Sequence, residues 1–95
     1  MLKLEVIGYI SQSAEIKQTP AKKEYAFFIV NTIDEKGNES FIKCFFYGCS
    51  ANRSKTLKSG SKIIVWGKLN LSLFDKIDGT KEININLNVD DVHLI

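Results

Sequence analysis

The segment ININLNV, residues 83–89, alternates strictly between apolar side chains and asparagines. Successive side chains of a β-strand point to opposite faces, so a period of two is that of a strand rather than a helix. Ile83, Ile85, Leu87 and Val89 therefore share one face, and the three asparagines share the other. This segment is the clearest indication that the chain folds as a β protein.

Four further segments are predicted to be strands: residues 2–10, 25–33, 39–48 and 62–74. The polar segment 11–24 holds the only proline, Pro20, and is expected to be a loop or an edge. In the fourth of the five strands, one face carries Ile63, Val65, Leu69, Leu71 and Leu73. A hairpin turn is expected around Asp78-Gly79, ahead of the last strand.

Residues 49–60 break the alternation and end in Ser59-Gly60, which is typical of a short helix with a glycine stop and Leu57 as its inward anchor. The order is then three strands, a helix and two strands. This order predicts an all-β fold: a five-stranded OB-fold barrel with one short helix between strands 3 and 4. Gly8 and Gly67 are expected to bend strands so that the barrel closes. The 95 residues suit a single domain over residues 1–95.

The net charge and the reactive side chains exclude several kinds of site but do not by themselves identify a binding partner. The net charge is only +2, and 12 of the 13 basic residues are lysines, so the placement of the lysines matters more than their number. Cys44, Cys49 and the single histidine, His93, provide no zinc set, so no metal or cofactor is expected. No nucleophile–base set is present, so the chain is not expected to be an enzyme, and Asp90-Asp91 fits a strand end better than a metal pair.

The N-terminus, MLKLEVIG, lacks the basic-then-apolar pattern of a signal peptide. No apolar run approaches the length of a membrane-spanning helix. A cytoplasmic protein is therefore expected, with no membrane partner and no small-molecule substrate.

The third predicted strand, ESFIKCFFYG, has aromatic side chains on its second face. Ile42, Cys44 and Phe46 form an inward set, whereas the outward side chains are Phe41, Lys43, Phe45 and Tyr47. A sequence-tolerant binder of single strands needs flat rings for stacking bases and cations for the backbone. The outward face offers both.

Four segments in order carry a resemblance to the bacterial-type single-stranded DNA-binding protein family. They are LEVIGYI, FIKCFFYG, LKSGSKIIVWGKL and VDDVHLI, and the third is the most specific because Leu57, Gly60, Ser61, Gly67 and Leu69 fall in place together. The resemblance implies an OB fold that assembles as a homo-dimer or homo-tetramer, with single-stranded DNA wrapped over its outer surface. It places the family's stacking rings on Phe41, Phe74 and Tyr47, and the basic residue between them on Lys43.

The chain also departs from the family pattern. Tyr9 replaces the usual asparagine after the first glycine, Trp66 replaces a small or charged residue, and Asn70 and Ser72 occupy positions that are often basic. The sequence ends at Ile95, so the family's acidic C-terminal tail is expected to be absent. That ending is expected of a tail-less phage, plasmid or mobile-element member, or of a truncated sequence.

Two sets of site residues are predicted on the outer face. The stacking set is Phe41, Tyr47 and Phe74, followed by Phe27 and Trp66. The phosphate-binding set is Lys3, Lys43, Lys62 and Lys68 on strands, Lys22 and Lys23 in the first loop, and Lys76 and Lys81 on the last hairpin. Phe45, Ile64 and Trp66 could equally pack against another subunit, and Tyr9 and Tyr25 are interpreted as structural.

The predicted function is sequence-non-specific binding and protection of single-stranded DNA in replication, recombination or repair. The alternative is a protein-interaction or assembly module, such as a primosome-type relative with the same fold and weak nucleic acid binding. The mild net charge, Asn70 and Ser72 and the expected lack of a tail motivate this alternative.

Overall fold

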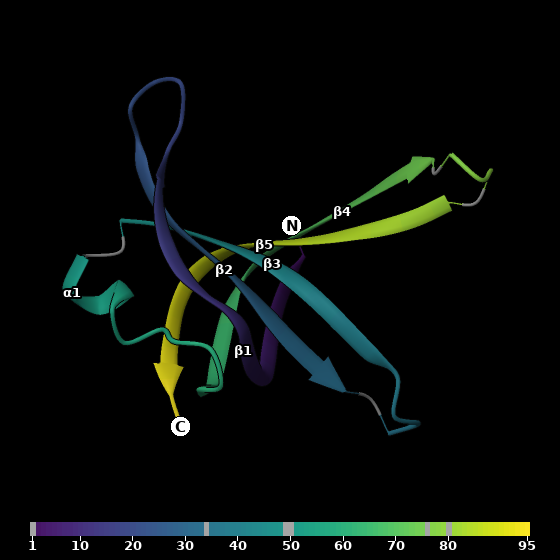
Figure 1. Cartoon of the computed structure of the whole chain (residues 1–95), viewed down its shortest axis with the longest axis horizontal. Helices are drawn as coiled ribbons and strands as arrows, with labels where there is room; N and C mark the ends of the chain where they lie inside the picture. Colours follow the sequence, from purple (N-terminus) through teal and green to yellow (C-terminus); the bar gives the residue numbers. More distant parts are fainter. Residues whose placement is uncertain (1, 34, 49–50, 76, 80) are drawn as a thin grey trace.

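The structure is a computed structural model that describes residues 2–33, 35–48, 51–75, 77–79 and 81–95, with the side chains of 51, 52, 74 and 81–83 outside that description (Figure 1). Its elements are β1 (Lys3–Gln18), β2 (Glu24–Ile33), β3 (Glu39–Tyr47), α1 (Ala51–Ser54), β4 (Lys62–Asp75) and β5 (Lys81–Leu94). The strands form a closed barrel in the order β1-β2-β3-β5-β4. β3 and β5 are parallel, and the other neighbours are antiparallel. The predicted all-β barrel is confirmed.

The barrel core is built from the inward residues of every strand. Phe28, Val30, Ile63, Val65 and Leu87 are fully buried, as the alternation of each strand predicts. Leu57, from the segment after α1, is also buried, and its carbonyl accepts a hydrogen bond from the backbone N–H of Ala14 on β1.

Cys44 lies on the inward face of β3 and is completely buried. Burial raises the pKa of its thiol to about 12, because a thiolate would lose its hydration there. The thiol therefore behaves as a small apolar group in this core.

Residues 11–24 are predicted to be a loop or an edge, and their first part is an edge strand that pairs with β2 alone. β1 continues to Gln18 and pairs with β2, and the turn is confined to Thr19–Lys23. The register shifts between Ile10 and Gln12 and again between Gln12 and Glu15. These irregularities break the alternation of side chains by which a continuous strand is predicted from the sequence.

Three hairpins extend beyond the closed barrel, formed by β1–β2, β2–β3 and β4–β5 (Figure 1). The predicted apolar face of β4 follows this division. Ile63 and Val65 are buried in the barrel, but Leu71 and Leu73 are 53% and 67% exposed on the β4–β5 hairpin. A side chain on the inward face of a strand is therefore buried within the barrel but exposed where the strand extends beyond it.

Gly67 marks a close crossing of β4 and β5. A Cβ at Gly67 would lie 2.0 Å from the carbonyl oxygen of Asn88, and one at Gly8 would lie 2.4 Å from the carbonyl oxygen of Asn31. Both predicted bends are thus places where another backbone approaches too closely for a side chain.

The prediction that Asp90-Asp91 stands at a strand end is wrong, because β5 runs on to Leu94. Trp66 pairs with Asp91 and Gly67 with Val89, which leaves Asp90 as the extra residue of a bulge. The extra residue lets β5 continue with Val92 in the core. In the described ranges, no helix is long and apolar enough to cross a membrane.

Candidate nucleic-acid interface

One row of outward side chains crosses all five strands of the barrel. Directly opposed residues of neighbouring strands share a face. Lys3 of β1 is opposite Lys68 of β4, Lys68 is opposite Asn88 of β5, and Asn88 is opposite Phe45 of β3. Phe45 is in turn opposite Phe27 of β2. The row changes from cationic to amide to aromatic within one continuous surface.

The β2–β3 side of this surface holds four rings in mutual contact. We call Tyr25, Phe27, Phe45 and Tyr47 the aromatic face. The ring centroids of Tyr25 and Tyr47 lie 5.2 Å apart, those of Phe27 and Phe45 5.3 Å, and those of Tyr25 and Phe45 5.9 Å. All three pairs are tilted, a geometry favourable to aromatic contacts.

Phe41 lies at the opposite end of β3 from Tyr47. Its side chain is 55% exposed, and its neighbour on β2 is Asn31. At about 3.3 Å per residue, some 20 Å of strand separates the two rings. Lys43 lies between them, exposed, with Ile29 on one side and Asn86 on the other. β3 therefore presents an aromatic platform near each end with a cation between.

Two lysines meet on the outer face, with the exposed carboxylate of Glu5 two residues from Lys3 on the same face of β1. Lys3 and Lys68 are exposed and directly opposed, an arrangement that destabilises a sheet unless an anion lies between the two charges. Lys17 has its ammonium 4.6 Å from the centre of the Phe27 ring, so it adds a cation to the aromatic face.

Three of the other predicted lysines, Lys62, Lys22 and Lys23, lie away from this row. Lys62 starts β4 opposite Tyr9, and Lys22 and Lys23 are exposed at the β1–β2 turn. Lys76 lies outside the described residues. Lys81 begins β5, but its side chain lies outside the description.

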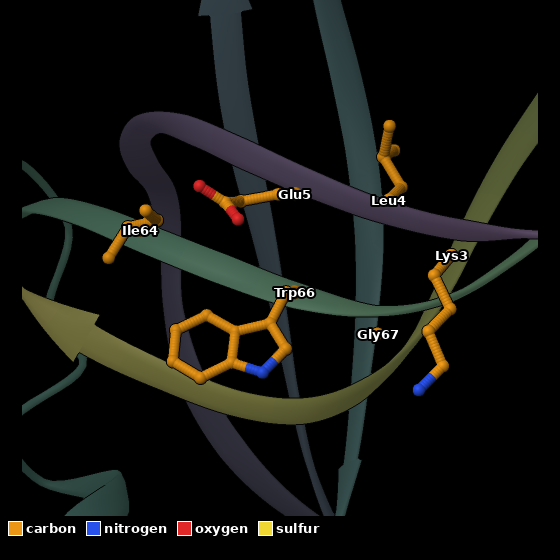
Figure 2. A pocket seen from close by; sticks show the side chains of 6 residues that line it. All are labelled: Lys3, Leu4, Glu5, Ile64, Trp66 and Gly67. Atoms are coloured by element: carbon orange, nitrogen blue, oxygen red, sulfur yellow. The ribbon is translucent and has the colours of Figure 1, made fainter.

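Two of the predicted stacking residues, Phe74 and Trp66, lie on β4. Phe74 takes its place on β4 opposite Glu82, and its side chain lies outside the described part of the chain. Trp66 lies in a shallow hollow on the outside of β1 and β4, beside Glu5 and Ile64 (Figure 2). Its indole is stacked on the His93 ring, with centroids 5.3 Å apart and planes 10° apart. In the described part of the chain, no ring of the aromatic face contacts Trp66.

The only arginine of the chain holds α1 against β5. Arg53 Nη2 donates to Asp91 Oδ1 at 2.5 Å and also to the Val92 carbonyl, and its guanidinium lies over the Phe46 ring. The backbone N–H of Val92 and the Arg53 guanidinium lower the pKa of the Asp91 carboxyl. Within the described ranges, no cluster of three or more histidine, cysteine or acidic side chains could hold a metal ion.

Three members of this surface, Tyr25, Phe45 and Lys17, are not in the site sets predicted from the sequence. The sequence favours a structural role for Tyr25, leaves two roles open for Phe45, and places Lys17 in a segment predicted to be a loop or an edge. The segment AEIKQ does carry a signal, because Ala14 and Ile16 alternate with charged residues as in a strand. That alternation could have placed Lys17 on the same hairpin as Tyr25.

Comparison with known proteins gives one family. The model of the single-strand binding protein family matches residues 1–95. Among solved structures, the barrel is similar to a small single-stranded DNA-binding protein from Streptomyces coelicolor, with a TM-score of 0.76 and 14% identity, covering 99% of this chain and 94% of that chain. A search of curated proteins found no significant match. At such low identity, the structural likeness supports the OB fold.

Proposed function

The chain belongs to the single-strand binding protein family, and from this membership we propose that it binds single-stranded DNA on the outer surface of the five strands. The observation that carries the proposal is the continuous row from Lys3 and Lys68 through Asn88 to Phe45 and Phe27. A strand lying over this row would meet cations and rings together, as a binder without sequence preference requires.

In this proposal the rings and the lysines have different tasks. Bases stack on Phe41 and on the aromatic face, and every base has a π-face, so stacking is tolerant of sequence. The Phe27 ring contacts both the Phe45 ring and the Lys17 ammonium, which helps to hold it in place. Phe74 belongs to the stacking set through the family resemblance.

Phosphates are neutralised by lysines along the same path. Lys43 lies between the two ends of β3, and the opposed pair Lys3 and Lys68 would be relieved by an anion between them. Lys62, Lys22, Lys23, Lys76 and Lys81 extend the path in the proposal. Each contact to single-stranded DNA should add about −0.7 to the slope of log affinity against log salt.

We also propose that the chain acts as a homo-dimer or homo-tetramer. Within the described residues, β1 pairs with β4 from Lys3 onward but with β2 only from Tyr9 onward. One edge of β1 before Tyr9 therefore offers backbone groups to a second strand. Leu2 and Ile7 are exposed beside this edge. Light scattering coupled to size exclusion would give the oligomer number.

The wider role follows from the family. Its members are intracellular binders rather than enzymes, so we propose that residues 1–95 act as one single-stranded DNA-binding domain in the cytoplasm, during replication, recombination or repair. The family membership favours this role over that of an assembly module with weak nucleic acid binding.

The test is a titration of labelled oligo-dT and of a duplex of equal length, followed by anisotropy at several salt concentrations. Saturable binding to oligo-dT that salt weakens, with much weaker binding to the duplex, supports the proposal. Equal affinity for both, or no binding of oligo-dT at low salt, refutes it. Lys43→Ala should reduce the salt slope by about 0.7.

A further inference from the structure

We propose that Asn70, Asn86 and Asn88 form an amide strip that hydrogen-bonds the edges of bases stacked beside it. This inference rests on the proposed single-stranded DNA site and assigns to that site a base-contacting element distinct from its rings and lysines. The strip would add affinity that depends on the presence of bases and not on salt.

The register places the three amides in the centre of the proposed surface. Asn86 of β5 is opposite Lys43 on one side and Asn70 of β4 on the other. Asn88 is opposite Phe45 on one side and Lys68 on the other. Asn86 and Asn88 therefore lie between the aromatic strand β3 and the cationic strand β4.

The alternation of β5 turns Asn86 and Asn88 outward. Leu87, between the two, is fully buried, and Val89 is almost so. Asn70 and Asn88 are exposed, and Asn86 is half-buried. Asn86 and Asn88 are thus accessible from the surface while Leu87 between them fills the core, and Asn70 lies on the exposed part of β4 next to Leu71.

Core packing gives no reason for asparagine here. Asparagine is depleted in strands, where β-branched and aromatic residues fit better, and β5 is paired on both sides. In the described part of the chain, no side-chain hydrogen bond engages these three amides. Their donors and acceptors are directed to whatever lies on the surface.

The chemistry of an amide suits a base edge better than a phosphate. Each amide carries two N–H donors and one carbonyl acceptor, so it can meet the adjacent donor and acceptor groups of a base edge. A phosphate oxygen would use the donors alone. A base stacked on Phe45 has its edge beside Asn88, because the two residues are directly opposed.

The experiment compares bases with backbone. Asn86→Ala/Asn88→Ala is titrated with oligo-dT and with an abasic oligonucleotide of equal length, next to the wild type. One hydrogen bond between uncharged groups corresponds to about a 2- to 12-fold change in affinity, so the loss of one bond at each of the two positions should weaken binding of oligo-dT by about 4- to 140-fold. Its salt slope should equal that of the wild type, and both proteins should bind the abasic strand equally.

Two further variants control for folding and position. Asn86→Thr/Asn88→Thr lacks the amides but has a better strand propensity, so it should repeat the loss with an intact barrel. Asn38→Ala removes an exposed asparagine from the β2–β3 turn and should leave affinity unchanged. Wild-type affinity for oligo-dT in both double variants, or an equal loss on the abasic strand, overturns the inference while the proposed function stands. Failure of the wild type itself to bind oligo-dT removes both.

Discussion

Replacing Phe41 by alanine separates base stacking from stability more cleanly than any other change on this surface. The Phe41 side chain is 55% exposed, and no ring contact in the described part of the chain involves it. Its removal should therefore change the free energy of unfolding by no more than about 0.5 kcal/mol, as for other surface substitutions. A loss of binding would then reflect the ring itself.

The expected loss follows from the value of one stacked base. Base–aromatic stacking contributes about 1–3 kcal/mol by alanine substitution, which corresponds to a rise in Kd of about 5- to 160-fold. No neighbouring ring in the described structure touches Phe41, so none is placed to replace it. By contrast, Tyr47 contacts Tyr25, which could still stack after Tyr47→Ala. The effect of Phe41→Ala should therefore be the larger of the two.

Anisotropy titration with labelled oligo-dT measures the loss, and urea unfolding measures stability on the same preparations. Ile33→Ala is the matched control, because Ile33 is 59% exposed and apolar on the same hairpin but carries no ring. The reasoning is refuted if Phe41→Ala binds within about twofold of the wild type. It is also refuted if Ile33→Ala weakens binding as much, since burial of apolar area would then explain both. A change in oligomer size with Phe41→Ala would instead assign the ring to a subunit contact.

Three other predictions concern the barrel. Gly67→Ala should cost about 1–3 kcal/mol or more in urea unfolding, because its Cβ would lie 2.0 Å from the Asn88 carbonyl oxygen; wild-type stability would contradict the close crossing. In a Cys49→Ser background, Cys44 should react with a thiol reagent only at the rate of unfolding. Its pKa rises from 9.0 to about 12 on folding, so the barrel should lose stability between pH 9 and pH 12, and Cys44→Ala should lack this loss. The Asp91 carboxyl has a lowered pKa, so its contribution to the free energy of unfolding should be present above pH 3.8 and lost as the pH falls. In urea unfolding, Asp91→Asn should be less stable than the wild type at neutral pH, and the difference should shrink in acid.

Alternation within a strand was enough to predict which way most side chains point. It placed Phe28, Ile42 and Cys44 inside and Phe41 and Tyr47 outside, because the side-chain period of a strand is fixed by its geometry. The strand order around the helix was enough to predict the barrel. Both inferences use local information that the sequence carries directly.

Pairing between strands could not be obtained in this way. The contact of Trp66 with His93 and that of Lys17 with Phe27 each depend on register, which is set by bulges that the sequence does not mark. At Asp90, a single extra residue changes which later side chains of β5 face the core. The rows of the candidate site are therefore a property of the assembled sheet, although each of their members is visible in the sequence.

Because the core and the outer surface are formed by opposite faces of the same strands, residues of the outer surface can be substituted independently of the core. Its buried side chains, such as Cys44 and Leu87, lie on the opposite faces of the same strands that carry Phe45 and Asn88 outward. Because neighbouring residues of one strand serve different faces, an outward residue can change without opening a cavity in the core. Rings, amides and lysines can then be exchanged at fixed register. Affinity, its salt dependence and its dependence on bases should therefore be separable by substitution, whereas changes at Gly67 should affect all of them through the fold.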